Sequence, residues 1–314
     1  MKTTQDFCVS SARASQLILK GEVVAFGTET VYGLGADARN SKAVAQIFAL
    51  KGRPHFNPLI IHLAQIQQAF ELIEWTPLAD RLASAFWPGP LTLVGNRRIE
   101  QNDISLLCSA GTNSLAVRVP AKGLEFLRAC ACPVAAPSAN RSGFLSPTQA
   151  QHVFQSFGAE LCPAILDNGP ASFGLESSIL DLRFPKPVLL RAGSISREAL
   201  EVITGPLELQ LSSDKPDAPG QLRSHYAPKV PLRINVKAPE ANETWLAFAH
   251  EGTLNPPHMD LSPRGDIFEA AARFFAYLHK AEGYNQPIAV APIPNEGLGL
   301  AINDRLIRAA QNCS

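Results

Sequence analysis

The sequence has no net charge, few cysteines and no long apolar run, and each absence narrows what the protein can do. Its 28 lysines and arginines balance 28 aspartates and glutamates. This balance argues against a long basic stripe for nucleic acid, although a local basic patch is compatible with it. No apolar run reaches the length of a membrane span, and the first twenty residues lack the apolar stretch of a secretory signal. We therefore expect a cytoplasmic protein with no membrane partner.

Several common catalytic motifs are also missing. The sequence contains no G-x-x-x-x-G-K-[ST] motif, which excludes an ordinary P-loop enzyme. It has no G-x-G-x-x-G in a first βα turn, no H-E-x-x-H and no G-x-S-x-G nucleophile elbow. If this protein uses ATP, it must bind the nucleotide through scattered cations and hydroxyl groups.

The cysteines do not form a metal-binding pattern. Only Cys130 and Cys132 are close in sequence, and they lack the second pair that a structural zinc site requires. We expect no protein-ligated metal and reduced thiols at all six positions, which are Cys8, Cys108, Cys130, Cys132, Cys162 and Cys313.

The length of 314 residues predicts two domains. Strand-like runs alternate with helical patterns over the first 200 residues, which indicates a mixed α/β domain with one extended sheet. We expect strands at 23–28, 58–63, 91–94, 115–119, 134–136, 165–167, 178–182 and 188–191, and helices at 11–20, 41–51, 77–86, 123–130 and 147–157.

The composition changes after about Ile203, where proline, glycine and serine become frequent and periodicity is lost. Beyond this stretch, strands at 244–250 and 288–293 and helices at 267–280 and 301–310 are enough for a small βαβ-type unit. The expected organisation is therefore a domain at 1–204, a linker at 205–229 and a second domain at 230–314. The linker carries His225 and Tyr226, which a simple spacer does not need.

The segment KGRPHFNPLIIH, residues 51–62, is the densest group of candidate binding residues. Lys51 supplies a mobile point charge, and Arg53 supplies a planar fork for phosphate or carboxylate oxygens. An ordinary basic turn would explain these two cations alone. Asn57 and His62 favour a polyanion pocket instead, because they flank an apolar run that is typical of a buried strand ending in a cleft.

Five further clusters combine small, hydroxyl-bearing or cationic residues with strand ends. The first three have a plain structural explanation: a β-turn at 28–35, a surface arginine at 114–120 and a helix cap at Ser146. The functional alternatives are close approach of the backbone to a ligand in the first cluster, an anion in the second, and a site for phosphate, ribose or an amino acid in the third. An arginine within an alternating strand, as at Arg118, is costly to bury unless it meets an anion. The clusters are TETVYGLG (28–35), SLAVRVP (114–120), PSANRSG with SPT (137–148), GLESS (174–178) and LRAG (190–193).

Taken together, these segments resemble the Sua5/YrdC family of threonylcarbamoyl-AMP synthases, in the longer two-domain Sua5 form. The matching segments occur in family order over nearly the whole chain and are TETVYGLGADA, KGRPHFNPLIIH, WPGPLTLV, SLAVRVP, APSANRSGFLSPT, GLESSILDL, LLRAG, HYAP and EGLGLAINDRL. The resemblance implies a twisted mixed-sheet YrdC-like domain with a concave cavity, followed by a small Rossmann-like α/β domain. It also implies the formation of L-threonylcarbamoyl-AMP and pyrophosphate from L-threonine, bicarbonate or CO2, and ATP.

The resemblance further implies roles for individual residues. Lys51 and Arg53 would be the catalytic cations, and Mg²⁺ would accompany ATP. The implied ATP contacts are Arg53, Asn57, Ser114, Asn140, Thr148, Arg191 and Tyr226. The implied threonine contacts are Thr30, His62, Arg118, Ser138 and Ser177. His225 and Tyr226 would fold over the nucleotide, so that the linker acts as a lid.

The product would pass to the system that transfers threonylcarbamoyl to adenosine 37 of ANN-decoding tRNAs, and a weak contact with tRNA itself is left open. Gly27, Ser114, Leu222 and Arg223 depart from the residues that are usual in the family. One alternative is a double-stranded RNA- or tRNA-binding module without catalysis. Another is the carbamoyl chemistry of hydrogenase maturation factors, whose acylphosphatase and zinc-finger segments are missing here.

Overall fold

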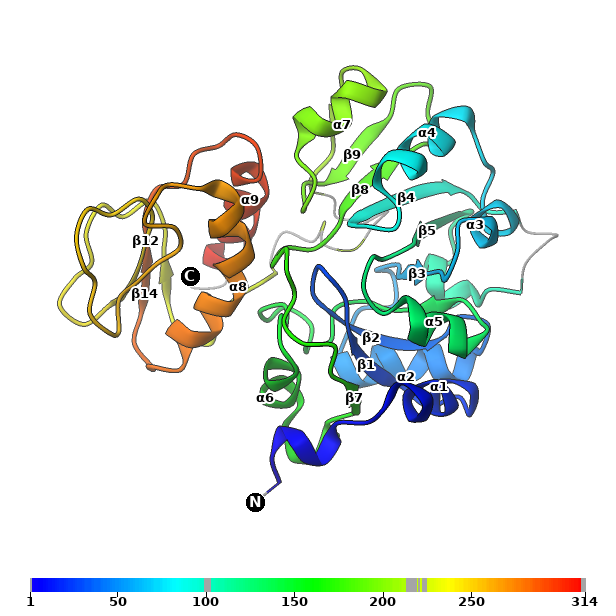
Figure 1. The fold of residues 1–314 in the computed structure, drawn as a ribbon, viewed down its shortest axis with the longest axis horizontal. Helices are drawn as coiled ribbons and strands as arrows, with labels where there is room; N and C mark the ends of the chain where they lie inside the picture. Colours follow the sequence, from blue (N-terminus) through cyan, green and yellow to red (C-terminus); the bar gives the residue numbers. More distant parts are fainter. Residues whose placement is uncertain (1, 99–102, 213–218, 220, 222–224, 312–314) are drawn as a thin grey trace.

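The computed structural model describes residues 2–98, 103–212, 219, 221 and 225–311. These residues form two sheets with helices packed around them (Figure 1). The helices are α1 (Ser11–Leu19), α2 (Ser41–Lys51), α3 (Gln67–Leu72), α4 (Pro77–Phe86), α5 (Leu124–Cys130), α6 (Ala150–Leu161), α7 (Arg197–Thr204), α8 (Ile267–Glu282) and α9 (Gly299–Ala310), with 3-10 turns at Thr4–Phe7 and Leu106–Ser109.

The larger sheet has ten strands in the order β10-β9-β8-β4-β5-β3-β6-β2-β1-β7. Neighbouring strands of this sheet form both parallel and antiparallel pairs. The pairs β3–β5 and β4–β8 are parallel, whereas β1–β2 and β4–β5 are antiparallel. The predicted α/β class with a mixed sheet is therefore confirmed. The strands are β1 (Val24–Gly27), β2 (Tyr32–Asp37), β3 (Ile60–His62), β4 (Leu91–Asn96), β5 (Ser114–Arg118), β6 (Val134–Ala135), β7 (Ala164–Leu166), β8 (Ser178–Asp181), β9 (Val188–Arg191) and β10 (Glu208–Leu209).

The capping residues of helix α2 determine where Lys51 and Arg53 lie. The Asn40 side chain accepts hydrogen bonds from the first backbone N–H groups of the helix and fixes its start. Gly52 ends the helix in the left-handed conformation, with φ of 61°, which glycine adopts without a Cβ clash. The chain therefore turns immediately after Lys51 and leads Arg53 towards the edge of the sheet.

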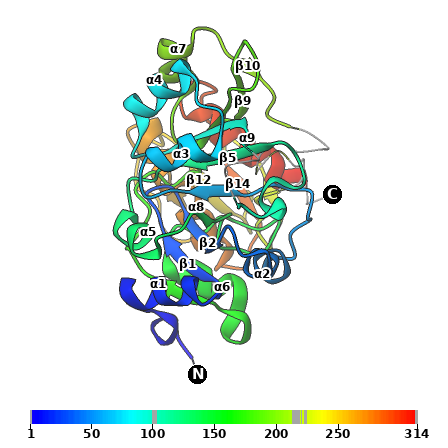
Figure 2. The same ribbon diagram turned by 90° about the vertical axis from the view of Figure 1, so that its right-hand side faces the viewer.

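The smaller domain has four parallel strands in the order β11-β14-β12-β13. They are β11 (Leu232–Arg233), β12 (Thr244–Ala247), β13 (Met259–Asp260) and β14 (Ile288–Val290). Helices α8 and α9 lie between this sheet and the larger domain (Figure 1), and Figure 2 shows the smaller domain behind the larger one. These two helices therefore form the smaller domain's side of the junction.

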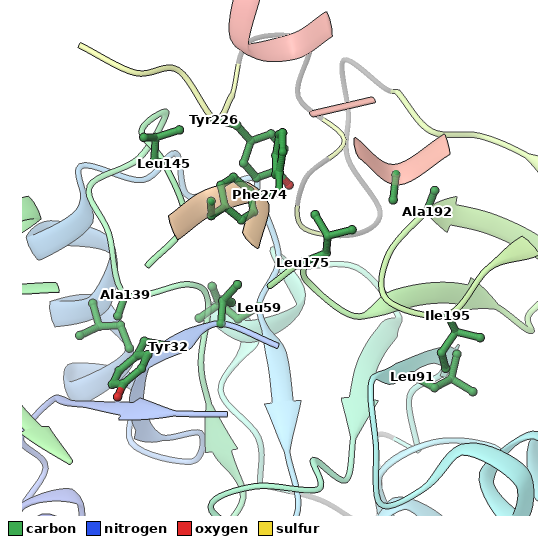
Figure 3. Packing of buried hydrophobic residues seen from close by; sticks show 14 of the residues in the cluster. Tyr32, Leu59, Leu91, Ala139, Leu145, Leu175, Ala192, Ile195, Tyr226 and Phe274 are labelled. Carbon is green, nitrogen blue, oxygen red and sulfur yellow. The ribbon is translucent and has the colours of Figure 1, made fainter. Parts of the chain in front are cut away.

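One hydrophobic core runs through both domains. It joins Leu59 and Leu175 of the larger domain to Phe274 of α8 and Ile302 of α9 without a break. Tyr226 belongs to the same cluster (Figure 3). The domains are therefore packed against each other by buried apolar surface, which is the dominant stabilising term in folded proteins.

Some elements depart from the sequence-based expectation. The segment Thr28–Gly35 was expected as a loop after a strand, but strand β2 already begins at Tyr32. Its glycines obscured the strand, because they lack the side chains on which strand patterns depend. Helices α3 and α7 were not expected either. Helix α7 begins a few residues after β9. Its N-cap residue, Ser196, is a typical signal for the start of a helix and could have predicted it.

No helix in the described part of the chain is both long and apolar enough to cross a membrane. The five cysteines within these residues are free thiols, as expected, and Cys313 lies outside them. Burial raises the pKa of Cys108, Cys130 and Cys132 to about 12, which makes these thiols unreactive.

The junction predicts a steric effect at Gly174. This residue has φ of +69°, and a Cβ atom there would lie 2.4 Å from the carbonyl oxygens of Ala271 and Ala272 in α8. We expect Gly174→Ala to destabilise the protein by about 2 kcal/mol or more, because α8 must move. Chemical denaturation measures this change.

Gly52→Ala is the matched control, because Gly52 is in the left-handed conformation, with φ of 61° and ψ of 35°, and has no neighbouring atom within 4 Å of a Cβ. This variant should lose only the backbone term of about 1 kcal/mol. Equal losses in the two variants would show that α8 does not press on Gly174.

Candidate active site

A cavity of about 40 Å³ lies where strands β3 and β5 of the larger sheet end, and it opens partly towards solvent. Hydroxyl groups, cations and small apolar side chains form its wall. The lining residues are Thr28, Thr30, Val31, Gly33, Arg53, Ile60, His62, Arg118, Ala136, Pro137, Ser138, Glu176, Ser177, Arg191, Pro219, His225 and Tyr226.

The sheet topology brings distant segments together in this cavity. His62 and Arg118 are direct partners in the parallel pairing of β3 with β5, and each is the last residue of its strand. Thr30 lies in the turn before β2, Ser138 follows β6, and Ser177 precedes β8. Ligands commonly bind at the carboxyl ends of parallel strands in α/β sheets, and this cavity fits that rule.

Arg118 is fixed on three sides. Its Nη2 lies 2.5 Å from Glu29 Oε1, its Nη1 donates to Thr30 Oγ1 at 2.9 Å, and its Nε donates to the Gly89 carbonyl oxygen at 3.1 Å. Burial alone would raise the pKa of Glu29, but the charge of Arg118 and the hydrogen bonds to the carboxylate together outweigh burial, and the net change is downward. Each terminal nitrogen of Arg118 has a second N–H group, so the guanidinium keeps two donors for a carboxylate ligand.

His62 is neutral and has an unused nitrogen. Its side chain is buried, and Nδ1 has no hydrogen-bond partner in the described residues. Burial, assisted by Arg118, lowers the pKa of His62 to about 3. A buried polar atom without a partner costs free energy, and a ligand in the cavity would supply the missing hydrogen bond.

Arg53 and Arg191 form a second, strongly cationic end of the cavity. Arg53 donates to Asn57 Oδ1 at 2.6 Å and to the Pro58 carbonyl oxygen at 2.8 Å, whereas Arg191 donates to the carbonyl and hydroxyl oxygens of Ser177. All these acceptors are neutral. Burial lowers the pKa of Arg53 to about 9, and Arg191 adds to this shift. Burial also lowers the pKa of Arg191 to about 10.

The linker residues His225 and Tyr226 close one side of the cavity. Both side chains are buried, and their ring centroids lie 4.0 Å apart. Burial lowers the pKa of His225 to about 3, so its imidazole is neutral, and its Nδ1 lacks a partner in the described residues. The cavity therefore combines a polar end, a cationic end and an aromatic cover.

Comparisons with known proteins match this arrangement. Residues 16–193 match the Sua5, YciO and YrdC sequence family, described as "Telomere recombination", and residues 195–311 match "Threonylcarbamoyl-AMP synthase, C-terminal domain". The chain belongs to the Sua5/YrdC family. Its two matched regions correspond to the two-domain Sua5 form.

Curated relatives that are similar to this Sua5-type chain over most of its length include several threonylcarbamoyl-AMP synthases. Threonylcarbamoyl-AMP synthase of Bacillus subtilis is 36% identical, with 95% of this chain and 92% of the relative covered. The protein of that name from Pyrococcus abyssi is 38% identical, with 95% and 93% covered. The solved structure of P. abyssi Sua5 complexed with L-threonine superposes with a TM-score of 0.87 at 33% identity, and covers 96% of this chain and 94% of its own.

In this Sua5-type structure, eight of the residues predicted for the site line one cavity. They are Thr30, Arg53, His62, Arg118, Ser138, Ser177, Arg191 and Tyr226. Their roles towards each substrate stay predictions, but their convergence agrees with a shared site.

Five other predicted residues lie outside the cavity lining. Lys51 is buried beneath it, where Nζ donates to the carbonyl oxygens of Ser138 and Asn140. Asn57 Nδ2 and Asn140 Oδ1 are buried without a partner in the described residues. Such atoms are candidates for ligand contact if the neighbouring loops shift.

Thr148 and Ser114 complete this group. Thr148 Oγ1 lies 3.3 Å from Nδ1 of His152. Ser114 begins β5, four residues before Arg118, so the two are separated by about 13 Å along the strand. Only a long ligand, or two ligands end to end, would reach both.

Three charged residues of the site were not predicted. Glu29 and Glu176 lie within recognised clusters, and Arg305 lies within the matching segment EGLGLAINDRL, yet none was given a role. Glu29 binds Arg118, and Glu176 binds Arg305. The sequence did offer a signal for the two glutamates: each lies among hydroxyl-bearing and glycine residues of a predicted binding cluster. A carboxylate buried there needs a cation nearby, so an ion pair could have been expected. Leu222 and Arg223 lie outside the described residues.

The neutral His62 predicts a pH-dependent loss of stability. Its folded pKa of about 3 lies below the ordinary value of 6.5, so the unfolded chain binds the proton more readily. The stabilisation is complete above pH 6.5 and is lost as the pH falls towards 3. Between pH 7 and pH 5, the wild type should lose about 2 kcal/mol more than His62→Gln. Urea denaturation at the two pH values measures the difference, and equal losses would contradict a neutral His62.

Proposed function

We propose that this protein forms L-threonylcarbamoyl-AMP and pyrophosphate from L-threonine, bicarbonate or CO2, and ATP. One observation carries the proposal: the cavity holds more buried positive charge than its carboxylates balance. Glu29 pairs with Arg118 and Glu176 pairs with Arg305, whereas Arg53 and Arg191 donate to neutral oxygens. A buried charge without a counterion is expensive, and a polyphosphate would supply the missing negative charge.

The polar end suits the amino acid. The two spare donors of Arg118 match a carboxylate, and Thr30, Ser138 and Ser177 offer hydroxyl groups around it. The neutral Nδ1 of His62 can accept a hydrogen bond from the threonine amine or hydroxyl group. In support, a close structural relative is described as complexed with L-threonine.

The chemistry needs alignment and charge neutralisation more than covalent help. The amine of threonine attacks CO2, loses a proton and becomes a carbamate. A carbamate oxygen then attacks the α-phosphorus of ATP, the bond to the β-phosphate oxygen breaks, and pyrophosphate leaves. Arg53 and Arg191 would stabilise the charge that moves onto pyrophosphate, with Lys51 behind them.

The spacing of the predicted contacts fits two substrates that lie end to end. The distance of about 13 Å between Ser114 and Arg118 suits a nucleotide extending away from threonine. The linker side chains His225 and Tyr226 would exclude water from the labile mixed anhydride. The domain arrangement of a catalytic unit, a covering linker and a second domain is part of the same proposal.

Magnesium would enter with ATP. The two carboxylates at the cavity are bonded to arginines, and the described residues contain no group of three histidine, cysteine, aspartate or glutamate side chains suited to a metal. A magnesium ion would therefore be held by phosphate and water oxygens, where it would neutralise charge on the leaving pyrophosphate. We propose that the product serves threonylcarbamoylation of tRNA by a separate transferase.

The proposal predicts a specific product. Incubation with ATP, bicarbonate and L-threonine should yield threonylcarbamoyl-AMP, detected by mass spectrometry, with pyrophosphate in equal amount. L-Threoninamide should react about 100-fold less well, because it removes the carboxylate that Arg118 would bind. Amidation makes the neighbouring amine less basic, so a poorer supply of free amine would not explain the loss. Strong tRNA binding without any adenylate would instead support the RNA-binding alternative.

The cationic end can be tested by mutation. Lys51→Ala and Arg53→Ala should each lower pyrophosphate release that depends on threonine and bicarbonate by at least about 100-fold. Arg53→Ala removes a charged donor that lines the cavity, and Lys51→Ala removes the buried cation that holds the backbone of Ser138 and Asn140. Circular dichroism checks that both variants fold. Arg39→Ala is a suitable control, because Arg39 forms a partly exposed ion pair with Asp37 away from the cavity lining. Full activity in both site variants would remove the proposed role of this end.

A further inference from the structure

Arg305 of α9 is the largest fully buried side chain in the described residues. It belongs to the smaller domain but reaches across the junction. Its Nε and Nη2 lie 3.2 Å and 3.1 Å from Glu176 Oε2, and its Nη1 donates to the carbonyl oxygen of Ala192. Both partners belong to the larger domain, and Glu176 lines the cavity.

Glu176 links this arginine to the nucleotide end of the site. Its Oε1 accepts a hydrogen bond from Ser146 at 2.5 Å, two residues before the predicted ATP contact Thr148. Burial would raise the pKa of Glu176, but Arg305, Arg191 and the hydrogen bonds to the carboxylate together outweigh burial and shift it downward. The carboxylate is therefore charged and held between two segments of the site.

Tyr226 is the second group that Arg305 supports. The guanidinium carbon of Arg305 lies 5.4 Å from the centroid of the Tyr226 ring, within cation–π range. Tyr226 has φ of 65°, a left-handed conformation that costs free energy for any residue other than glycine. The ring of Phe275 in α8 lies 5.7 Å away. Two helices of the smaller domain therefore hold Tyr226 in a strained position at the cavity.

A buried ion pair is a poor means of simply joining two domains. Well-packed apolar residues of similar volume usually stabilise such an interface equally well or better. The apolar core already crosses this junction. The charge at Arg305 therefore calls for an explanation other than adhesion.

We infer that Arg305 is a positioning residue for the nucleotide end of the active site, supplied by the smaller domain. This inference rests on the proposed function. Arg305 fixes Tyr226 over the cavity and Glu176 on its wall, beside Arg191. Among the described residues, it makes no hydrogen bond to the amino-acid end, where Glu29 fixes Arg118 instead. No described residue of the smaller domain lines the cavity, so this domain contributes to ATP binding indirectly.

Arg305→Met should weaken the binding of ATP but not the binding of L-threonine. We expect the Kd for ATP, measured by calorimetry without threonine, to rise about 10-fold, as expected for loss of a desolvated cation–π contact and its ion pair. The turnover rate should fall about 10-fold or more for the same reason. The Kd for L-threonine, measured without ATP, should stay within about two-fold of the wild-type value. An equal loss of affinity for both substrates would overturn the inference.

A double variant distinguishes positioning from structural support. Arg305→Met alone leaves Glu176 buried without its cation, which is strongly destabilising. Glu176→Gln combined with Arg305→Met removes both charges, and we expect the melting temperature to recover while turnover and ATP affinity stay low. Recovery of wild-type activity together with stability would show that Arg305 only joins the domains.

Arg273→Met provides a matched control in the same domain. Arg273 also pairs with a carboxylate, Glu269 at 2.8 Å, and lies 5.8 Å from the Tyr277 ring, but it is partly exposed on α8. This variant should keep wild-type kinetics. The binding measurements need no turnover. A wild type that binds ATP but forms no threonylcarbamoyl-AMP would therefore contradict the proposed function and leave the inference about Arg305 separately testable.

Discussion

The surplus of buried positive charge is the constraint on which the rest of this structure depends. Arg53 and Arg191 are held by neutral oxygens, and Lys51 donates to two carbonyl groups beneath the same wall. Burial lowers the pKa of Lys51 well below its ordinary value, and Arg53 adds to the shift. Such a site is poised for a polyanion, because ligand binding removes an electrostatic cost that the free protein carries.

The fold places this positive charge beside the polar end of the cavity, where the charge of Arg118 is balanced. The parallel pairing of β3 with β5 aligns His62 with Arg118, and Glu29 neutralises the arginine there. Only a few strands away, β9 ends at Arg191. Arg305 of the smaller domain contacts Glu176 and Tyr226 in the cavity wall, so both domains shape one cavity. Two-domain architecture is then part of how the site is built, since neither Glu176 nor Tyr226 is fixed by the larger domain alone.

Much of the fold could be predicted from the sequence, because periodic helices and capped termini carry local signals. Helix α2 was expected at its observed bounds, and its Asn40 cap and Gly52 stop explain why. Strand β2 was missed because glycine weakens the strand pattern. The clusters that converge in the cavity were recognised, but the ion pairs Glu29–Arg118 and Glu176–Arg305 join residues 89 and 129 positions apart. No local pattern reports such contacts, which only the folded sheet and the domain junction create.

The most direct test is a crystal structure with L-threonine and a non-hydrolysable ATP analogue bound together. We expect the threonine carboxylate within hydrogen-bond distance of Arg118 and the triphosphate between Arg53 and Arg191. The threonine amine should point towards the α-phosphate, with room for CO2 between them. A triphosphate bound away from both Arg53 and Arg191 would contradict the assignment of the buried positive charge to ATP.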